Sequence, residues 1–456
     1  MLFGYAHRKK DKTLALRYFL ADMTEGQGVP FKVATLEHTM SPLALADNGT
    51  TALMRKSEFG FGKSDYLETW SFASDRIKRL LQWYPYKESS GGNRDIKWAR
   101  FVEEGRALTV SGGGKLVLWD TETAEPVYHF AIKGGSYPGL SSDRKYVCYS
   151  RGEHIGVLDV AEGKVLATRT VDSLTWPHLR FNPGGTKIAC LDHTRVKVWR
   201  FADGELLLDM SKRGLPSGNF HFVDENHLLI SGKTLFDVHN RLTVWSYEGA
   251  GAAEEFGDYT CLLTTGSHRS SSMLMIERLP QALVTETVAK AMEAPDFWVF
   301  AKGTKVKLNL DGLPDQDQVE RVRAALTTKL TARGCQVGDN GKIELLATVK
   351  ESEKKKEVSY GRAFGPFARG AVPFKLREFI SRAKFVYKGE TAWEQTGTNI
   401  PSSFSLKDGE AITEALKRFQ KPNYAWFEKL ELPLVLRKPT GSATFGQSRV
   451  TSAGIQ

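Results

Sequence analysis

Two histidines and an aspartate that lie close together are the first residues that could carry out chemistry. His221 and His227 lie on either side of Asp224. Imidazole and carboxylate groups at this spacing suit a metal site or an acid–base pair, but a solvated hairpin accounts for them more simply. His178 follows Trp176-Pro177 at a predicted junction between repeats, where packing or capping is the expected role. We therefore predict no catalytic or metal-binding residue among them.

A glycine-rich segment, Ser111-Gly-Gly-Gly-Lys115, has some of the residues of a phosphate-binding loop. Such a loop needs a helix after the lysine, because the phosphate binds to the amide groups at the N-terminus of that helix. The residues that follow, Leu116-Val-Leu-Trp119, are typical of a strand, so the glycines are predicted to form a turn. The sequence contains no nucleophile elbow, no paired metal-binding carboxylates and no dinucleotide fingerprint. We therefore expect no enzyme activity and no cofactor.

The histidines and cysteines are distributed in a way that limits chemistry further. All 10 histidines occur at or before His268, so the C-terminal part of the chain lacks the commonest general base and metal ligand. The four cysteines (Cys148, Cys190, Cys261 and Cys335) are scattered, without a CxxC motif or zinc spacing. Cys148 and Cys190 lie in apolar runs, where cysteine is usually a small core residue. No disulfide framework is predicted.

A repeat defines the elements that would position any site. Five segments share an apolar anchor, a polar turn and a second apolar run, and the anchors from Phe101 to Phe222 recur about every 40 residues. The Asp, Asn, Gly and Pro residues at the centres of these segments are what a turn between antiparallel strands requires. The five anchors are Leu45, Phe101, Leu140, Phe181 and Phe222.

Each anchor is followed by a strand that ends in tryptophan or leucine. The separation is the same from Phe101 to Trp119, from Leu140 to Leu158 and from Phe181 to Trp199. The first and last repeats, which end at Trp70 and Trp245, are longer. Their extra residues are predicted to be insertions in the second hairpin loop of each repeat.

A period near 40 residues with several short strands per unit predicts a β-propeller. Over residues 1–282 the chain resembles the WD-repeat family, of which Trp119-Asp120 is the single literal WD dipeptide. We expect six or seven blades. Leu14 to Met23 and Val29 to Leu36 are predicted to pair with strands in residues 258–279, so that both ends of the segment close a sixth blade. The Gly-His pair of WD repeats is absent, so we expect the blades to rely mainly on apolar packing.

Residues 283–439 are predicted to form a small two-layer α/β sandwich of order β-α-β-β-β-α. Its first helix ends near Ala332, and its apolar stripe contains Val322, Leu326 and Leu330. A helix from about Gly409 to Phe419 is predicted near its end. The Gly-, Ser- and Thr-rich residues 440–456 predict a disordered tail. This arrangement is similar to uncharacterised bacterial WD-repeat proteins with a C-terminal α/β module; the similar segments begin at Asp311 (Asp-Gly-Leu-Pro), Thr391 (Thr-Ala-Trp-Glu), Lys407 (Lys-Asp-Gly-Glu) and Lys421 (Lys-Pro-Asn-Tyr).

Two segments are predicted interaction surfaces. The first is an inserted aromatic loop in the first repeat, and exposed aromatic residues are common binding anchors. The second combines arginine, glycine and aromatic residues, which suits contact with a protein or an anion. The alternatives are a loop that folds back over its own blade and an ordinary connection between strands or domains. The candidate residues are Phe59, Phe61 and Tyr66 in the first segment, and Arg362, Phe364, Phe367, Arg369, Lys375 and Arg377 in the second.

We interpret the chain as a non-catalytic scaffold that binds a protein or peptide through its propeller and offers a second contact surface on its C-terminal domain. One alternative is a propeller hydrolase or quinoprotein-like oxidoreductase, which needs carboxylates, histidines or cations that converge at the central channel. Another is polyanion binding, because most of the net charge of +10 lies in residues 281–456. No apolar run is long enough to span a membrane. The absence of a signal peptide favours the cytoplasm, although a longer parent protein would remove that argument.

Overall fold

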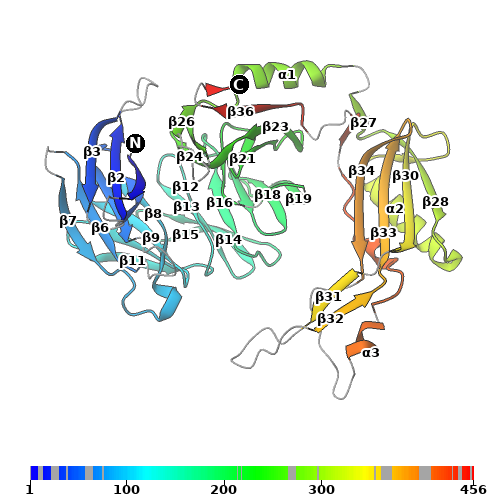
Figure 1. Ribbon diagram of the computed structural model, residues 1–456, viewed down its shortest axis with the longest axis horizontal. Helices are drawn as coiled ribbons and strands as arrows, with labels where there is room; N and C mark the ends of the chain where they lie inside the picture. Colours follow the sequence, from blue (N-terminus) through cyan, green and yellow to red (C-terminus); the bar gives the residue numbers. More distant parts are fainter. Residues whose placement is uncertain are drawn as a thin grey trace. The chain divides into compact units, whose positions relative to one another are not determined.

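The computed structural model divides into two units (Figure 1). Unit 1 comprises Met1–Thr285 together with Thr444–Gln456, and unit 2 comprises Glu286–Ala443. None of the described helices is long and apolar enough to cross a membrane. The structure describes residues 2–8, 14–21, 30–36, 40–56, 65–73, 77–212, 214–216, 218–264, 274–294, 297–353, 356–360, 372–399, 412–417, 419–433, 435–439, 444–451 and 454–456.

Unit 1 contains a six-bladed β-propeller arrangement. Five blades are built on four-stranded antiparallel sheets that follow one another along the chain. Blade 1 consists of β4 (Met40–Leu45), β5 (Thr51–Lys56), β6 (Leu67–Ser71) and β7 (Lys78–Trp83). Blade 2 consists of β8 (Ile96–Glu103), β9 (Arg106–Ser111), β10 (Lys115–Asp120) and β11 (Pro126–Ala131). Blade 3 consists of β12 (Gly139–Leu140), β13 (Tyr146–Arg151), β14 (His154–Asp159) and β15 (Val165–Thr170).

The next three blades continue the same order. Blade 4 consists of β16 (His178–Phe181), β17 (Lys187–Leu191), β18 (Arg195–Arg200) and β19 (Leu206–Ser211). Blade 5 consists of β20 (Phe220–Phe222), β21 (His227–Ile230), β22 (Thr234–Asp237) and β23 (Leu242–Glu248). Blade 6 is the three-stranded sheet of β24 (Ala250–Phe256), β25 (Tyr259–Thr264) and β26 (Leu274–Glu277). The first strands of neighbouring blades contact one another, as β16 and β20 do, which is the arrangement of innermost strands around a propeller axis.

The N-terminal strands form a sheet of their own. β1 (Leu2–Arg8), β2 (Leu14–Ala21) and β3 (Pro30–Leu36) pair with one another, and β1 contacts β4 of blade 1. The prediction that these strands would complete a blade together with residues 258–279 is therefore wrong, because each group closes its own antiparallel hairpins.

The apolar anchors bury the faces that neighbouring blades share. Phe222 of blade 5 packs in one cluster with Val198 and Leu208 of blade 4. Trp98 of blade 2 packs with Val147 of blade 3 in another. Each blade thus covers a face that its neighbour cannot bury alone, which is what stabilises a repeat of this kind.

The tryptophan or leucine that follows the anchor in each repeat occupies the same place in four of the five blades. Trp70, Trp119, Leu158 and Trp199 each lie opposite the first or second residue of the second strand of the blade. In blade 5 this position is taken by Phe236, which lies opposite Leu228, whereas Trp245 lies on the outer strand β23. The predicted insertion in the second hairpin is therefore wrong for the last repeat, where a short turn joins β21 to β22. In blade 1 the extra residues do lie between β5 and β6.

The C-terminal residues return to the propeller and do not form the expected disordered tail. β36 (Gly446–Thr451) pairs in parallel with β23 of blade 5, and β37 (Gly454–Ile455) pairs with β36. The composition concealed this strand because only Ser448 and Val450 are buried, which is too weak a pattern to predict a strand. The added strand is held by the edge of β23.

Unit 2 is built around a five-stranded mixed sheet of order β29-β28-β30-β33-β34. Helix α2 (Gln316–Ala332) packs against this sheet through Val322, Leu326 and Leu330, which share a core with Leu345 and Phe385. Asp315 caps its N-terminus by accepting a hydrogen bond from the Asp317 amide. The strands are β28 (Lys305–Gly312), β29 (Gln336–Val337), β30 (Ile343–Glu351), β33 (Phe379–Tyr387) and β34 (Glu390–Thr398).

The remaining elements of unit 2 lie outside that sheet. β31 (Lys356–Tyr360) and β32 (Val372–Leu376) form a separate hairpin outside the main sheet. β27 (Trp298–Phe300) pairs with β35 (Leu436–Arg437), which joins the two ends of the unit. The helices are α1 (Ala282–Met292), which crosses the unit boundary, α3 (Ile412–Lys417) and α4 (Ala425–Lys429).

Candidate functional site

The predicted aromatic loop of blade 1 is represented in the described residues by Tyr66 alone, since Phe59 and Phe61 lie outside them. Tyr66 is half-buried against the core of its own blade, and its ring lies 5.5 Å from that of Tyr84. This placement agrees with the alternative of a loop that folds back over its blade.

The second predicted surface is described only at its end. Arg362, Phe364, Phe367 and Arg369 lie outside the described residues, and Lys375 is described only as part of the backbone of β32. Arg377 is exposed, and its Nη1 atom lies 3.8 Å from Glu351 Oε1. Polyanion binding at this surface therefore stays a prediction.

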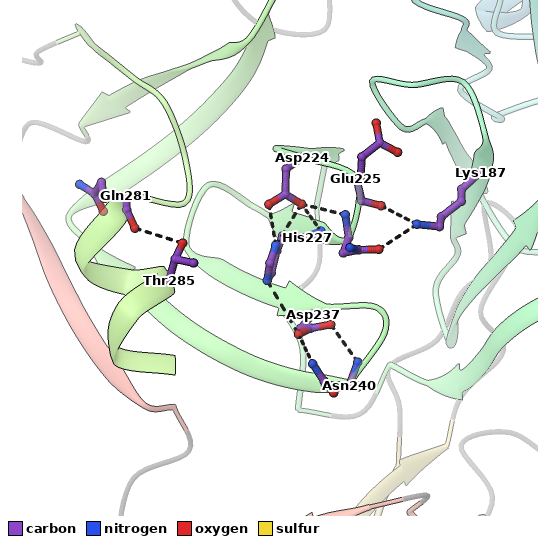
Figure 2. Close-up of polar contacts among 9 residues, drawn as sticks. Lys187, Asp224, Glu225, His227, Asp237, Asn240, Gln281 and Thr285 are labelled. Carbon is purple, nitrogen blue, oxygen red and sulfur yellow. Dashed lines mark hydrogen bonds and ion pairs between the residues drawn. The ribbon is translucent and has the colours of Figure 1, made fainter. Parts of the chain in front are cut away.

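His227 and Asp224 form a polar network at a turn of blade 5 (Figure 2). His227 Nδ1 lies 2.7 Å from Asp224 Oδ2, and His227 Nε2 lies 3.8 Å from Asp237 Oδ2. Burial alone lowers the pKa of His227, but the hydrogen bond and charge of Asp224 outweigh it, so the pKa is raised overall. Asp224 also accepts hydrogen bonds from the Asn226 and His227 amides, which closes the turn. The network closes the turn between β20 and β21, and no metal-binding group of three ligands occurs among the described residues.

The same turn fastens blade 5 to blade 4. Glu225 Oε1 accepts a hydrogen bond of 2.7 Å from the Gly184 amide. Lys187 Nζ donates to the Glu225 carbonyl and to Asn226 Oδ1, each at 2.8 Å (Figure 2). These contacts join two first hairpins of neighbouring blades, so they contribute to the rigidity of the ring.

Blade 2 contains a buried hydrogen-bond chain in addition to its apolar packing. In blade 2, Trp119 Nε1 donates to Thr109 Oγ1 at 2.9 Å, and Thr109 Oγ1 lies 2.5 Å from the Tyr86 hydroxyl. Tyr86 precedes the first strand of the blade. These contacts join three buried side chains, so hydrogen bonds as well as apolar contacts stabilise the core of this blade.

The outer edge of blade 3 is the most open surface of the described propeller strands. All six residues of β15 are exposed, including Val165 and Leu166 at 43% and 55%. Arg169 is the only charged residue of the strand. Natural sheets usually protect such edges with charges, bulges or a covering segment, so an uncovered apolar edge favours the addition of a further strand.

A cavity of about 460 Å³ lies beside this edge, between blades 3 and 4. Its floor contains Lys197, which is buried and whose Nζ lies 3.4 Å from Asp172 Oδ2 and 3.5 Å from Asp209 Oδ2. Trp199 and Leu206 supply apolar walls. The cavity is large enough for one or two side chains, and it offers both apolar contact and polar partners.

Blade 5 shows how such an edge is covered. The Phe445 amide donates to the Val244 carbonyl at 3.0 Å, and Trp245 Nε1 donates to Ser448 Oγ at 3.1 Å. Trp245 is only 6% exposed as a result. A Cβ atom at Gly446 would lie 2.3 Å from the Trp245 ring, so only glycine allows this close approach. An extended segment on the outer strand of a blade is thus part of the structure itself.

The first strands, which surround the propeller axis, carry polar residues, and sequence interpretation missed the two arginines among them. Arg100, Arg180 and His221 each directly precede an anchor phenylalanine on the first strand of a blade. The position before the anchor recurs in every repeat, so it could have been found from the sequence. It was missed because the blades share no residue type at that position. Converging cations and histidines of this kind are what the enzymatic alternative requires as a starting condition.

Two further predictions concern turns and cysteines. Ser111 ends β9 and Lys115 begins β10, which confirms that the glycine-rich segment is a turn between strands. None of the four described cysteines forms a disulfide, and all four are buried. His178 stacks on Tyr137 at the junction of blades 3 and 4, as expected of a packing residue.

No model of a protein family matches the chain, and no curated protein matches it either.

Proposed function

We propose that the chain is a non-catalytic scaffold whose propeller binds an extended segment of a partner protein at the outer edge of blade 3. The observation that carries the proposal is the contrast between two outer strands. β23 is covered by β36 over residues 245–248, whereas β15 is exposed at every residue. The main-chain groups of an exposed edge offer hydrogen bonds to any extended peptide.

The neighbouring cavity supports a preference among peptides. A strand added to β15 would place alternate side chains toward blade 4, where the cavity between the blades begins. Apolar side chains would contact Trp199 and Leu206. A polar side chain would reach the exposed carboxylate of Asp172, whose side chain is 90% exposed.

The backbone of β15 allows a specific test. The Val171 amide donates to the Glu153 carbonyl. Every second amide that precedes Val171 on β15 therefore also faces β14. The amides of Thr168 and Thr170 therefore face outward. Thr168→Pro removes one outward donor without removing a hydrogen bond of the blade, and Thr168→Ala removes only the side chain.

The test is selection of displayed peptides of about 12 residues on the immobilised full chain, followed by measurement of their affinities for the variants. We expect selected peptides to bind wild type and Thr168→Ala alike, and to bind Thr168→Pro at least about tenfold more weakly, since one hydrogen bond and the fit of a strand are lost. Failure to select any peptide, or equal binding to Thr168→Pro, would show that β15 is not the docking edge. Circular dichroism of each variant establishes that the blades are intact.

A further inference from the structure

Arg100 and Arg180 occupy equivalent places in blades 2 and 4. Arg100 lies opposite Leu108 on the second strand of its blade, and Arg180 lies opposite Ala189. Each arginine precedes the anchor phenylalanine of a first strand, so both lie on the inner side of the propeller.

Both arginines are held by the same backbone contacts. Arg100 Nη1 donates to its preceding carbonyl, that of Ala99, at 2.9 Å, and to Leu43 O in blade 1 at 3.0 Å. Arg180 Nη1 donates to the Leu179 carbonyl at 2.9 Å and to Pro138 O, just before β12 of blade 3, at 3.2 Å. One nitrogen of each guanidinium is therefore fixed. The other N–H groups have no acceptor among the residues that the structure describes.

Two glutamates of blade 6 lie within electrostatic reach of this pair. The pKa of Arg100 is lowered, first by burial and then by the charge of Arg180, while Glu254 and Glu255 act in the opposite sense. Glu254 and Glu255 are exposed residues of β24. Desolvation raises the pKa of Glu255, and the charges of the two arginines partly offset this. In the described part of the chain, none of the four groups forms an ion pair within 4.0 Å.

Two neutral histidines complete the group. Burial and the charge of Arg180 lower the pKa of His178 and of His221 to about 4, so both imidazoles are uncharged near neutral pH. His221 Nε2 lies 3.2 Å from Thr260 Oγ1 of blade 6. His178 Nδ1 is buried and has no hydrogen-bond partner in the described part of the chain. An unpaired buried nitrogen costs free energy unless a bound molecule satisfies it.

We propose that this axial cluster, defined as Arg100, Arg180, His178, His221, Glu254 and Glu255, binds a small zwitterion that carries both an oxyanion and an ammonium group. The two guanidinium groups present fixed donors to a carboxylate or phosphate. Glu254 and Glu255 would repel an oxyanion alone, and the arginines would repel an ammonium group alone. A molecule with both charges satisfies the donors and the acceptors together. The inference does not depend on peptide binding at β15.

Binding is tested by titration calorimetry on the full chain at constant ionic strength. The probes are the common amino acids and phosphoethanolamine, compared with acetate, inorganic phosphate and ethylammonium as single-charge halves. We expect saturable binding of at least one zwitterion, and binding of its half-molecules weaker by about tenfold or more. Absence of saturable binding, or equal binding of a half-molecule, would overturn the proposal.

Variants locate the site. Arg180→Gln and Arg100→Gln are expected to weaken the zwitterion by at least about tenfold, while Arg200→Gln, at an exposed arginine paired with Asp203, leaves it unchanged. Arg180→Lys keeps the charge but loses the fork, so it provides a weaker-binding variant if Arg180→Gln fails to fold. Glu255→Gln should reduce the preference for the zwitterion over the matching oxyanion. Unchanged binding in the folded Arg100 and Arg180 variants would exclude the axis as the site.

Discussion

Blades that share the same repeat differ in the hydrogen bonds that single buried residues form. Thr109 is buried on the second strand of blade 2, and Thr69 is buried on the third strand of blade 1. Thr109 Oγ1 connects Trp119 to Tyr86, whereas Thr69 Oγ1 has no hydrogen-bond partner among the residues that the structure describes. The same hydroxyl therefore stabilises one blade and costs free energy in the other.

Valine substitution at these two sites provides a matched comparison. Thr109→Val leaves the Trp119 indole N–H and the Tyr86 hydroxyl buried and unpaired, so we expect a loss of about 2 kcal/mol or more in the free energy of unfolding. Thr69→Val removes an unsatisfied hydroxyl, and we expect it to be neutral or stabilising. Urea unfolding of the two variants measures both effects. An equal loss at both sites would show that the chain in blade 2 contributes nothing.

The His227–Asp224 pair makes stability depend on pH. The pKa of His227 is raised in the folded state, so its contribution is complete below the ordinary histidine pKa of about 6.5 and is lost as the pH rises through the folded value. We expect His227→Gln to lower the free energy of unfolding more at pH 6 than at pH 9, by on the order of 1 kcal/mol or less because the pair is partly exposed. The exposed His154→Gln serves as control. A difference between wild type and His227→Gln that is constant with pH would contradict this assignment.

At the level of elements, apolar periodicity in the sequence predicts the first strands of the blades, but it does not predict a strand such as β36 that is held mainly by backbone hydrogen bonds to a distant strand. The anchors from Leu45 to Phe222 all mark first strands, because each must fill the space between two blades. Trp245 was wrongly predicted to occupy the place that Phe236 takes in blade 5. A tryptophan can also be buried on the outer strand β23, because β36 covers it there. β36 itself lies almost 200 residues from its partner strand in the sequence, and its own residues carry no strong pattern.

Removal of β36 tests its contribution. A chain that ends at residue 443 loses the hydrogen bonds along β23 and exposes the Trp245 ring. We expect faster hydrogen exchange at residues 242–248 and a loss of on the order of 2 kcal/mol in stability from the uncovered indole and edge. Gly446→Val in the full chain should have the same effect, because its side chain would overlap the Trp245 ring. Unchanged exchange in both variants would show that β36 does not cover β23 in solution.

For the whole molecule, the axis was the least predictable part. A site on a propeller axis takes one or two residues from each of several blades, so its members are separated by about 40 residues and share no local motif. Arg100 and Arg180 are related only by their place before an anchor, and Glu254 and Glu255 come from a blade that the repeat pattern did not define. Which charges face one another becomes evident only once the ring is closed.

The return of β36 to blade 5 also links the folding of the two units in time. During synthesis the edge of β23 stays open until residues 446–449 have been made, and all of unit 2 precedes these residues in the chain. The pairing of β27 with β35 then joins residues 298–300 to 436–437, which removes most of the chain between β23 and β36 from the loop that must close. A shorter loop lowers the entropic cost of docking β36 by on the order of 1–2 kcal/mol. The completion of the propeller is thus favoured by the prior folding of a unit that interrupts it.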